Sequence, residues 1–329
     1  MAQNIRWGIL GTGSIAQQFA QGVQSATGAE LVAVGSRTQE SADAFGARFG
    51  VPRCYPTYEA LVSDPTVDVI YVSTPHILHK ENALLCLNAG KPVLCEKPFT
   101  INAADTREVV AQARAHGLFL MEAMWTRFLP AMVKIRELLR EGILGEVRML
   151  WADFGFYAEF NPKSRLYDLA LGGGSLLDVG IYPVSFAAMV MGQQPSQITS
   201  TAQVGSSGVD EHASVLFNYS GGQSAMLASA ISVQTPTRAT IAGEKGFIDI
   251  QAPFFRPSTF TVSLHNHEPR TYHYPFRGNG YNYEAEEVGR CLHAGLLEST
   301  IMPLDETLAI METMDAIRAQ WGLKYPGEA

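Results

Sequence analysis

Residues 5–25 read IRWGILGTGSIAQQFAQGVQS and decide the fold. An apolar strand pattern leads into the glycine-rich residues 11–16, and an amphipathic helical pattern follows at once. Strand, turn and helix in this order form the context in which a Gly-x-Gly-x-x-Gly/Ala fingerprint binds a dinucleotide. Gly11 permits the tight turn, Gly13 lets the backbone approach a pyrophosphate, and Ala16 allows the helix to pack closely on the strand.

The turn is expected to hold the phosphates of NAD(P) or FAD, because backbone N–H groups and the positive end of the helix dipole face the anion. A flavin needs a larger pocket than the short loops of this chain suggest, so a nicotinamide cofactor is favoured. We assign the contacts to Gly11, Thr12, Gly13, Ser14 and Ile15.

The residues after the second predicted strand choose between NAD and NADP. Val34 is followed by Gly35, Ser36, Arg37 and Thr38, so no Asp or Glu is there to bind a ribose 2′-hydroxyl. A hydroxyl and a guanidinium suit a 2′-phosphate, which accepts charge-assisted hydrogen bonds. We therefore predict NADP, bound by Ser36, Arg37 and Thr38. NAD stays open, since Arg also stacks on adenine in NAD sites.

The first third of the chain alternates strand and helix patterns, which is typical of βαβ units on a parallel sheet. This order predicts an α/β fold that begins with a doubly wound Rossmann domain, placed at residues 1–122. The patterns predict strands at residues 5–10, 31–35, 69–73, 93–96 and 119–122, and helices at 14–25, 39–49, 78–89 and 103–116.

From about residue 145 onwards, long alternating strands follow one another without helices between them. We assign residues 123–329 to an α+β domain with a large, mostly antiparallel, open-faced sheet that binds substrate. Apolar residues on one alternation of residues 223–233 would leave an exposed face, so we expect a homodimer through this sheet. The expected strands are 146–157, 197–204, 213–219, 223–233, 238–242 and 247–250, with helices at 131–141, 175–191, 283–294 and 306–320.

Length and charge argue against several classes of protein. The 329 residues suggest about two domains. The formal net charge of -8, from 24 Lys+Arg and 32 Asp+Glu, argues against a broad positive surface for nucleic acid or anionic lipid. We expect no membrane span and no signal peptide, because no apolar run approaches roughly 18–20 residues. The 4 cysteines form no C-x-x-C pair, so free thiols and a cytoplasmic location are expected.

A lysine ends one of the buried strands. Cys95-Glu96-Lys97-Pro98 delivers it to the carboxyl edge of the predicted sheet, where ligands of Rossmann domains bind. Pro98 restricts Lys97 to an extended backbone and permits a cis bond, which would aim the side chain across the crevice. The alternative is an ordinary lysine at the end of a strand.

A polar pair stands within the apolar sequence GGGSLLDVGIYPVSF, residues 172–186. Asp178 and Tyr182 are four residues apart and therefore share a helical face. Polar groups in such surroundings need partners or a function. The alternative is a capping Asp beside a core Tyr.

These motifs resemble the glucose-fructose oxidoreductase and inositol dehydrogenase (Gfo/Idh/MocA) family. Its pattern is an early Gly-x-Gly-x-x-Gly/Ala, a central Glu-Lys-Pro and a later Asp-x-Gly-x-His/Tyr, found here in order at Gly11, Glu96 and Asp178. The resemblance covers nearly the whole chain, and residues 121–128 and 177–182 look like the branch that acts on trans-dihydrodiols and D-xylose. It implies that the cofactor is contacted by Thr74, Pro75, His76, His79, Glu96 and Lys97.

The resemblance also implies the chemistry, which is oxidation of a hydroxyl-bearing carbon with Tyr182 as general acid/base assisted by Lys97. A free Tyr titrates near ~10, so it is a poor base unless an ammonium within about 4 to 6 Å stabilises the phenolate. Asp178 would orient Lys97 or a second substrate hydroxyl. Two residues depart from the family pattern. Tyr182 stands where many relatives have His, and Ser41 stands where some NADP-dependent relatives have a second basic residue.

Aromatic residues near the domain boundary suggest how a substrate is held, since their rings stack on a sugar face or enclose a diol. Arg127 would fix a hydroxyl or be purely structural. The residues assigned to the substrate are Trp125, Arg127, Phe154, Asp178 and Tyr182. We expect no metal, because strand alternation puts His265 and His267 on one face without a convergent carboxylate or Cys.

Two other functions stay open. One is a dehydrogenase for inositol or another polyol. The other is a regulator that senses NAD(P) without turnover, since the family fold is also used by a sugar-pathway repressor. The presence of Lys97, Asp178 and Tyr182 together favours the enzyme.

Overall fold

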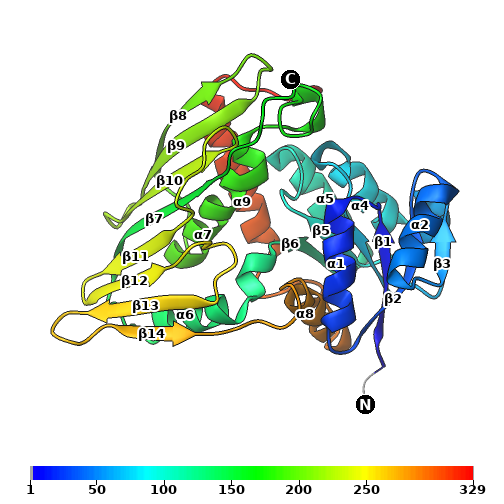
Figure 1. Ribbon diagram of the computed structural model, residues 1–329, viewed down its shortest axis with the longest axis horizontal. Coiled ribbons are helices and arrows are strands. Elements are labelled where there is room, and N and C mark those ends of the chain that lie inside the picture. Colours follow the sequence, from blue (N-terminus) through cyan, green and yellow to red (C-terminus); the bar gives the residue numbers. More distant parts are fainter. Residues whose placement is uncertain (1–2, 329) are drawn as a thin grey trace. The chain divides into compact units, whose positions relative to one another are not determined.

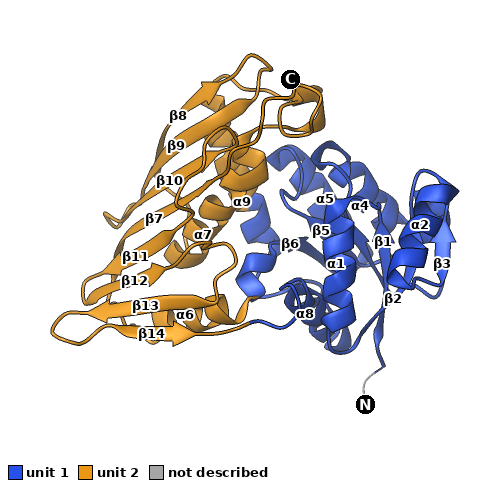
Figure 2. Cartoon of the chain, viewed as in Figure 1, with its two compact units in different colours: residues 1–128, 276–308 blue, residues 129–275, 309–329 orange. Residues whose placement is uncertain are grey.

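The computed structural model describes residues 3–328 and forms two compact units (Figure 2). The first unit consists of the chain up to residue 128 together with residues 276–308. The second unit consists of residues 129–275 together with the chain from residue 309 onwards. Each unit is therefore assembled from two separate stretches of sequence.

The single division expected between residues 122 and 123 differs from this arrangement, in which the first boundary lies between residues 128 and 129. Residues 276–308 return to the first unit after the last strand of the second. The amphipathic pattern of residues 283–294 shows that a helix buries one face, but it does not say which sheet that face covers.

A parallel sheet of six strands forms the centre of the first unit, with the order β3-β2-β1-β4-β5-β6 (Figure 1). The strand order reverses between β1 and β4, which is the place where open α/β sheets bind ligands. Every residue of β4 and β5 is buried. The strands are β1 (Ile5–Leu10), β2 (Ala29–Gly35), β3 (Arg53–Tyr55), β4 (Val69–Val72), β5 (Val93–Glu96) and β6 (Leu120–Ala123).

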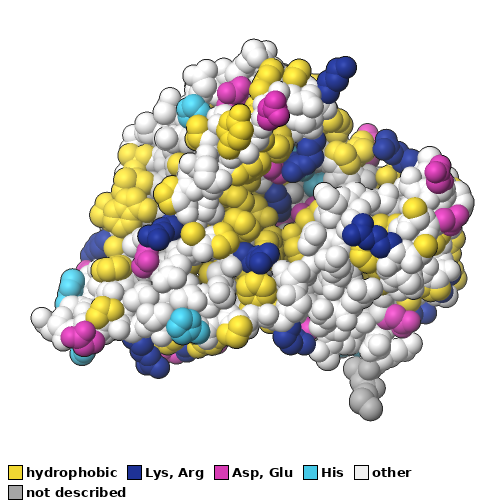
Figure 3. Space-filling view, viewed as in Figure 1, with side chains coloured by type: hydrophobic (Ala, Val, Ile, Leu, Met, Phe, Trp, Pro, Cys, Tyr) yellow, Lys and Arg dark blue, Asp and Glu magenta, His cyan; other side chains and the backbone are white. Residues whose placement is uncertain are grey.

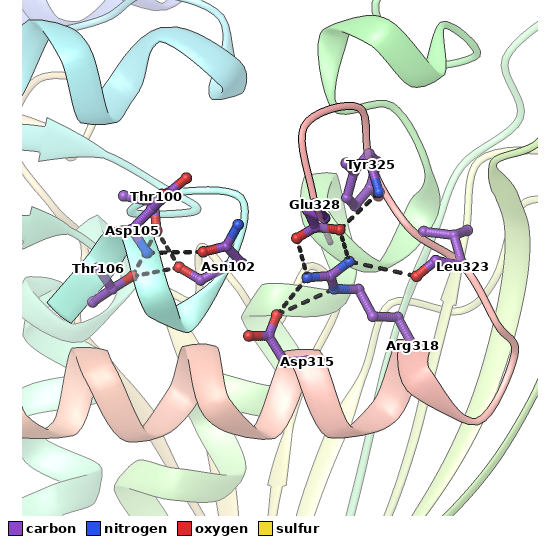
Figure 4. A network of polar contacts seen from close by, with 9 residues as sticks. All are labelled: Thr100, Asn102, Asp105, Thr106, Asp315, Arg318, Leu323, Tyr325 and Glu328. Carbon is purple, nitrogen blue, oxygen red and sulfur yellow. Dashed lines mark hydrogen bonds and ion pairs between the residues drawn. The ribbon is translucent and has the colours of Figure 1, made fainter. Parts of the chain in front are cut away.

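Side-chain caps begin several helices of the first unit. Thr38, Thr57 and Asn102 each accept a backbone N–H from the first turn that follows. Figure 4 shows Asn102 capping Asp105, with Thr100 bonded to Thr106 beside them. The helices are α1 (Ser14–Ser25), α2 (Gln39–Phe49), α3 (Tyr58–Val62), α4 (His79–Asn88), α5 (Ala103–His116) and α8 (Asn282–His293).

An eight-stranded sheet dominates the second unit, with the order β14-β13-β12-β11-β7-β10-β9-β8. All neighbours are antiparallel except β7 and β10. In β9 buried and more accessible residues alternate, so one face of the sheet is covered and the other is open. The strands are β7 (Val147–Gly155), β8 (Gln197–Val204), β9 (Asp210–Asn218), β10 (Ser224–Ala230), β11 (Ala239–Gly243), β12 (Gly246–Ile250), β13 (Thr259–Leu264) and β14 (Arg270–His273).

Three further helices complete the fold: α6 (Pro130–Arg140), α7 (Ile181–Met191) and α9 (Leu304–Ala319), whose first residues belong to the first unit. The helix predicted at residues 175–191 is not uniform. Its first part, Leu176–Gly180, is a π-helical turn that runs into α7. Such turns are frequent at functional sites.

Some short elements were missed by the sequence patterns, namely β3, α3, β13 and β14. The placement of His265 and His267 on one strand face was wrong, because both lie in the turn between β13 and β14. Asn266 between them has a φ of 61°, a left-handed conformation that breaks the strand alternation.

Among the described residues, one helical stretch, Leu169–Met191, is long and apolar enough to cross a membrane by length and composition alone. Ser175, Asp178 and Ser185 interrupt its apolar residues, so it is not an unbroken apolar run. Its most apolar part is 78% buried inside the protein. Burial of this kind is typical of a core helix.

Candidate active site

The turn between β1 and α1 fits a pyrophosphate. Gly11 has a φ of 109°, and a Cβ there would lie 3.0 Å from the Ser73 Oγ. A Cβ on Gly13 would meet nothing within 4 Å, so the space above this residue is open. Gly13 caps α1 without a side-chain hydrogen bond, and no acidic residue occupies the first turn of the helix. The N–H groups of Ser14 and Ile15 are therefore available to an anion at the positive end of the helix.

The end of β2 lies beside this turn. The Thr12 and Ser36 hydroxyls are 3.2 Å apart, and the Ser36 N–H donates to the Tyr55 carbonyl. Arg37 is exposed, and no ion pair joins it to another of the residues that the structure describes. Thr38 uses its hydroxyl to cap α2, accepting the Ser41 N–H at 3.2 Å. Arg37 is thus an exposed cation that directly follows Ser36 at the end of β2.

The segment after β4 is organised around the buried His79. Its Nδ1 lies 2.8 Å from the Pro98 carbonyl and its Nε2 lies 2.8 Å from the Thr74 carbonyl. A neutral imidazole donates to only one of these oxygens, whereas the imidazolium donates to both. Burial lowers the pKa of His79, and the two carbonyl groups oppose that shift. Pro75 and His76 lie between β4 and α4, where Pro75 is exposed and His76 half-buried.

The Lys97 turn follows β5 directly. The Glu96 carboxylate accepts hydrogen bonds from the Tyr71 hydroxyl and, at 3.1 Å, from the Lys97 N–H. The bond between Lys97 and Pro98 is cis. Glu96 is buried and Lys97 half-buried, so the backbone of this turn is fixed inside the unit.

A residue that the sequence reasoning missed supports the same turn. Glu122 in β6 is fully buried, and its Oε1 accepts the Phe99 N–H at 3.1 Å. Its Oε2 accepts the Thr307 hydroxyl at 3.2 Å. Burial raises the pKa of Glu122 to about 7, although Arg127 and these two donors oppose the shift. The only signal in the sequence was an acid within the apolar run at residues 119–124.

Two residues assigned to the substrate lie in the interior. Trp125 stacks on Tyr281, with ring centroids 4.6 Å apart. Arg127 is 2% exposed, pairs with Glu306 at 2.7 Å and donates to the Ile301 carbonyl at 3.2 Å. These contacts favour the structural alternative for Arg127.

In the second unit, Asp178 has an ion-pair partner that no pattern indicated. Arg165 donates through Nη1 to the Asp178 Oδ1 at 3.0 Å. The Asp178 side chain is 8% exposed and that of Arg165 is 55% exposed. A buried carboxylate thus has its charge balanced by an arginine that reaches solvent.

Tyr182 belongs to a cluster of three aromatic rings. Its ring centroid lies 5.4 Å from that of Phe154 and 5.5 Å from that of Phe255. Phe154 and Phe255 stack in parallel at 4.2 Å. Phe255 was missed by the sequence reasoning, because it stands in an irregular segment after β12. The cluster places the apolar rings of Phe154 and Phe255 beside the phenol ring.

The start of the helical segment that carries Asp178 and Tyr182 is held by Asp210. This fully buried carboxylate accepts the Leu176 N–H at 2.7 Å and the Ser175 hydroxyl at 2.8 Å. Burial raises the pKa of Asp210 to about 6, against the effect of both donors.

The C-terminal segment supports the glycines before this helix. The Tyr325 hydroxyl donates to the Gly173 carbonyl at 2.8 Å. Figure 4 shows how Arg318 bonds to Asp315, Glu328 and the Leu323 carbonyl, which holds the segment around Tyr325 in place.

The predicted site residues fall into two sets. The cofactor residues, Lys97, Trp125 and Arg127 lie in the first unit, whereas Phe154, Asp178 and Tyr182 lie in the second. Within the residues that the structure describes, no group of 3 or more His, Cys, Asp or Glu side chains could hold a metal ion.

Comparison with known families decides what kind of protein this is. Residues 5–124 match the family described as "Oxidoreductase family, NAD-binding Rossmann fold", and residues 132–249 match the "GFO/IDH/MocA C-terminal domain". The chain belongs to the Gfo/Idh/MocA family. This Gfo/Idh/MocA protein is an NAD(P)-dependent oxidoreductase, so the predicted family, enzyme class and α/β fold are confirmed.

Individual relatives are similar over their whole length. This Gfo/Idh/MocA protein is 40% identical to trans-1,2-dihydrobenzene-1,2-diol dehydrogenase of Mus musculus over 98% of both chains. The same-named protein of Homo sapiens is 38% identical, again over 98% of both chains.

Solved structures share the fold. The aldose-aldose oxidoreductase of Caulobacter crescentus has a TM-score of 0.86 at 27% identity, over 97% of this chain and 98% of that one. The 3-ketoreductase KijD10 of Actinomadura kijaniata, solved with NADP, has a TM-score of 0.86 at 25% identity, over 96% and 98%.

Proposed function

We propose that this protein is an NADP-dependent dehydrogenase that oxidises a hydroxyl-bearing carbon of a trans-dihydrodiol or of a D-xylose-like aldose. The observation that carries the proposal is the position of Tyr182, a phenol beside the rings of Phe154 and Phe255 and four residues after the ion-paired Asp178. Relatives named for a dihydrodiol and an aldose support the substrate class.

The open turn at Gly11 and Gly13 would hold the pyrophosphate of NADP, and Ser36 and Arg37 would hold its 2′-phosphate. When bound, NADP accepts the hydride from the alcohol carbon. Thr74, His79 and Glu96 would shape the nicotinamide end through the contacts that fix their loops. The overall change is an alcohol and NADP⁺ giving a carbonyl compound, NADPH and a proton.

Tyr182 would accept the hydroxyl proton as the alcohol is oxidised, and the Lys97 ammonium would favour its phenolate form. The ammonium would also hydrogen-bond the substrate oxygen as the carbonyl forms. Asp178, already paired with Arg165, would orient these groups rather than take the proton. Reduction of a carbonyl follows the same steps in reverse.

Phe154 and Phe255 form one flat stacked pair beside Tyr182, which suits an unsaturated diol ring or the apolar face of a sugar. Absorbance at 340 nm with NADP tests the substrate class. The panel contains a trans-dihydrodiol, D-xylose, D-glucose and inositols. The proposal expects NADPH formation with the dihydrodiol or an aldose. Turnover of inositols alone would replace it with the polyol alternative, and NADP binding without any turnover would favour a regulator.

Arg37 provides a test of cofactor choice. We expect Arg37→Ala to raise the Kd for NADP about 10- to 100-fold, because a charge-assisted bond contributes roughly 1.5–3 kcal/mol and every 1.4 kcal/mol is tenfold. The Kd for NAD should stay nearly constant, since NAD lacks the 2′-phosphate. Titration of protein fluorescence measures both constants. Arg48→Ala, on α2, serves as the control. An unchanged Kd for NADP in Arg37→Ala contradicts the assignment.

The open face of the second unit supports a homodimer. Trp151 lies opposite Met226, which lies opposite Leu216, and Ala242 lies between Met149 and Phe247. These apolar side chains are 37–43% exposed at Met149, Trp151, Leu216 and Phe247. Figure 3 shows hydrophobic side chains gathered over strands of this sheet. A second copy of the chain would cover such a face.

We expect Trp151→Glu to convert the dimer into a monomer at micromolar concentration, because a buried unpaired charge costs several kcal/mol. Light scattering after size-exclusion chromatography measures the mass. Leu297→Glu, at an exposed apolar position of the first unit, is the matched control and should leave the dimer intact. A monomeric wild-type protein would refute the proposed dimer.

We also propose a reducing, cytoplasmic location. All 4 cysteines, Cys54, Cys86, Cys95 and Cys291, are free. Burial raises the pKa of the Cys86, Cys95 and Cys291 thiols, which keeps them in the less reactive form.

A further inference from the structure

Glu122 is a buried acid that the chemistry above does not use. It is 0% exposed, and both of its oxygens accept hydrogen bonds. The donor to Oε1 is the N–H of Phe99, which is also 0% exposed. A buried N–H without an acceptor is costly, so the carboxylate matters to the backbone at Phe99.

The sheet register explains why Glu122 reaches this place. β6 pairs with β5 so that Glu122 lies beside Cys95 and Ala123 lies beside Glu96. The chain leaves β5 at Glu96 and turns through Lys97, and Glu122 lies on the neighbouring strand beside that turn.

The backbone around Lys97 is held at three successive residues. The Lys97 N–H donates to Glu96, the Pro98 carbonyl faces the His79 ring, and the Phe99 N–H donates to Glu122. Each contact comes from a different element of the first unit. Together they determine where the side chain of Lys97 begins.

We propose that Glu122 is a positioning residue for Lys97, and that it keeps the turn after β5 in the conformation that the reaction requires. This inference rests on the proposed function, because it assumes that Lys97 assists the reaction. Glu122 acts through the backbone at Phe99. A rigid support of this kind lets a catalytic group keep its alignment.

The titratable and charged groups around Glu122 come from two elements. Cys95 and Glu96 face it from β5, and Arg127 faces it from the segment after β6. Arg127 itself is paired with Glu306. Thr307, the second donor, is uncharged. Because burial brings the pKa of Glu122 to about 7, its ionised and neutral forms coexist near neutral pH.

Two substitutions at Glu122 separate the loss of its hydrogen-bond acceptors from the loss of its side-chain volume. Glu122→Ala removes both acceptors, and we expect kcat to fall about 100-fold, the loss that a misplacement of about 1 Å produces. The Kd for NADP and the substrate KM should change far less. Glu122→Gln keeps a carbonyl oxygen that accepts the Phe99 N–H. Its amide N–H can donate to the Thr307 hydroxyl. It should restore most of the lost rate.

The split between kcat and KM gives a readout that a purely structural role would not produce, because a misaligned Lys97 lowers kcat while cofactor and substrate still bind. Glu287→Gln removes another buried acid of the first unit, from α8, and should leave kcat close to wild type. A loss of kcat in Glu122→Gln as large as that in Glu122→Ala would overturn the proposal, because the amide keeps the acceptor for the Phe99 N–H.

Hydrogen exchange tests the support without turnover. The amides of residues 95–101 should exchange faster in Glu122→Ala than in wild type, and Glu122→Gln should match wild type. Thr307→Val leaves Glu122 in place and should give a smaller acceleration, which keeps the test available if the alanine variant does not fold. Unchanged exchange and unchanged kcat in Glu122→Ala would refute the role. If wild type turns over no substrate, the proposed function fails, while exchange still decides whether Glu122 holds the turn.

Discussion

We expect Tyr182→Phe to lower kcat about 10²- to 10⁴-fold, the range in which removal of a general acid/base acts. The substitution deletes only the phenol oxygen, so the ring keeps its contacts with Phe154 and Phe255. The Kd for NADP should therefore remain within about twofold of wild type, because the packing of the ring is preserved. Initial rates at 340 nm and a fluorescence titration measure the two quantities.

Tyr167→Phe is the matched control for that experiment. Tyr167 is another buried tyrosine of the second unit, and its hydroxyl donates to the Ala158 carbonyl at 2.9 Å. Loss of this bond should cost about 1 kcal/mol of stability and leave kcat close to wild type. Wild-type turnover in Tyr182→Phe would show that another group moves the proton.

Lys97→Met is the second large effect. It keeps a side chain of similar length but removes the ammonium that would bond the substrate oxygen. We expect kcat to fall about 10²- to 10³-fold, as when one donor to a developing charge is removed. The pH at which oxidation is half-maximal should also rise by roughly 1–3 units, because a phenolate without a neighbouring cation forms only at higher pH.

The pH profile of kcat, measured alongside Lys80→Met, checks this prediction. Lys80 lies on α4 and pairs with Asp105 and Glu108, so its replacement removes a lysine without touching the turn at Lys97. A Lys97→Met enzyme with near wild-type turnover would contradict the assignment of this residue.

Much of the first unit could be predicted because its elements leave local signals. The strands at residues 5–10 and 93–96 and the helices at 14–25, 39–49 and 103–116 have the same bounds in the structure. Gly11 directly follows the first strand, and each of the three helices begins or ends beside a glycine or a capping residue. The phosphate turn was found for the same reason, since its function depends on consecutive residues.

The parts that could not be predicted depend on contacts and geometry that leave no periodic pattern in the sequence. Arg165 pairs with Asp178, and Phe255 stacks on Phe154, without any periodic pattern that links them. In the sequence, Glu122 is an isolated acid. Only the pairing of β6 with β5 places it beside the turn after β5. The π-helical turn before Tyr182 also has no signature in an apolar sequence.

The most direct test of the account follows the hydride itself. Wild-type enzyme is incubated with NADP and a substrate deuterated at the carbon to be oxidised, either C1 of D-xylose or the carbinol carbon of a trans-dihydrodiol. Mass spectrometry of the isolated cofactor then measures the label. The proposed hydride transfer predicts NADPH that carries the deuterium lost from the substrate. Unlabelled NADPH, or no NADPH from an enzyme that binds NADP, would contradict it.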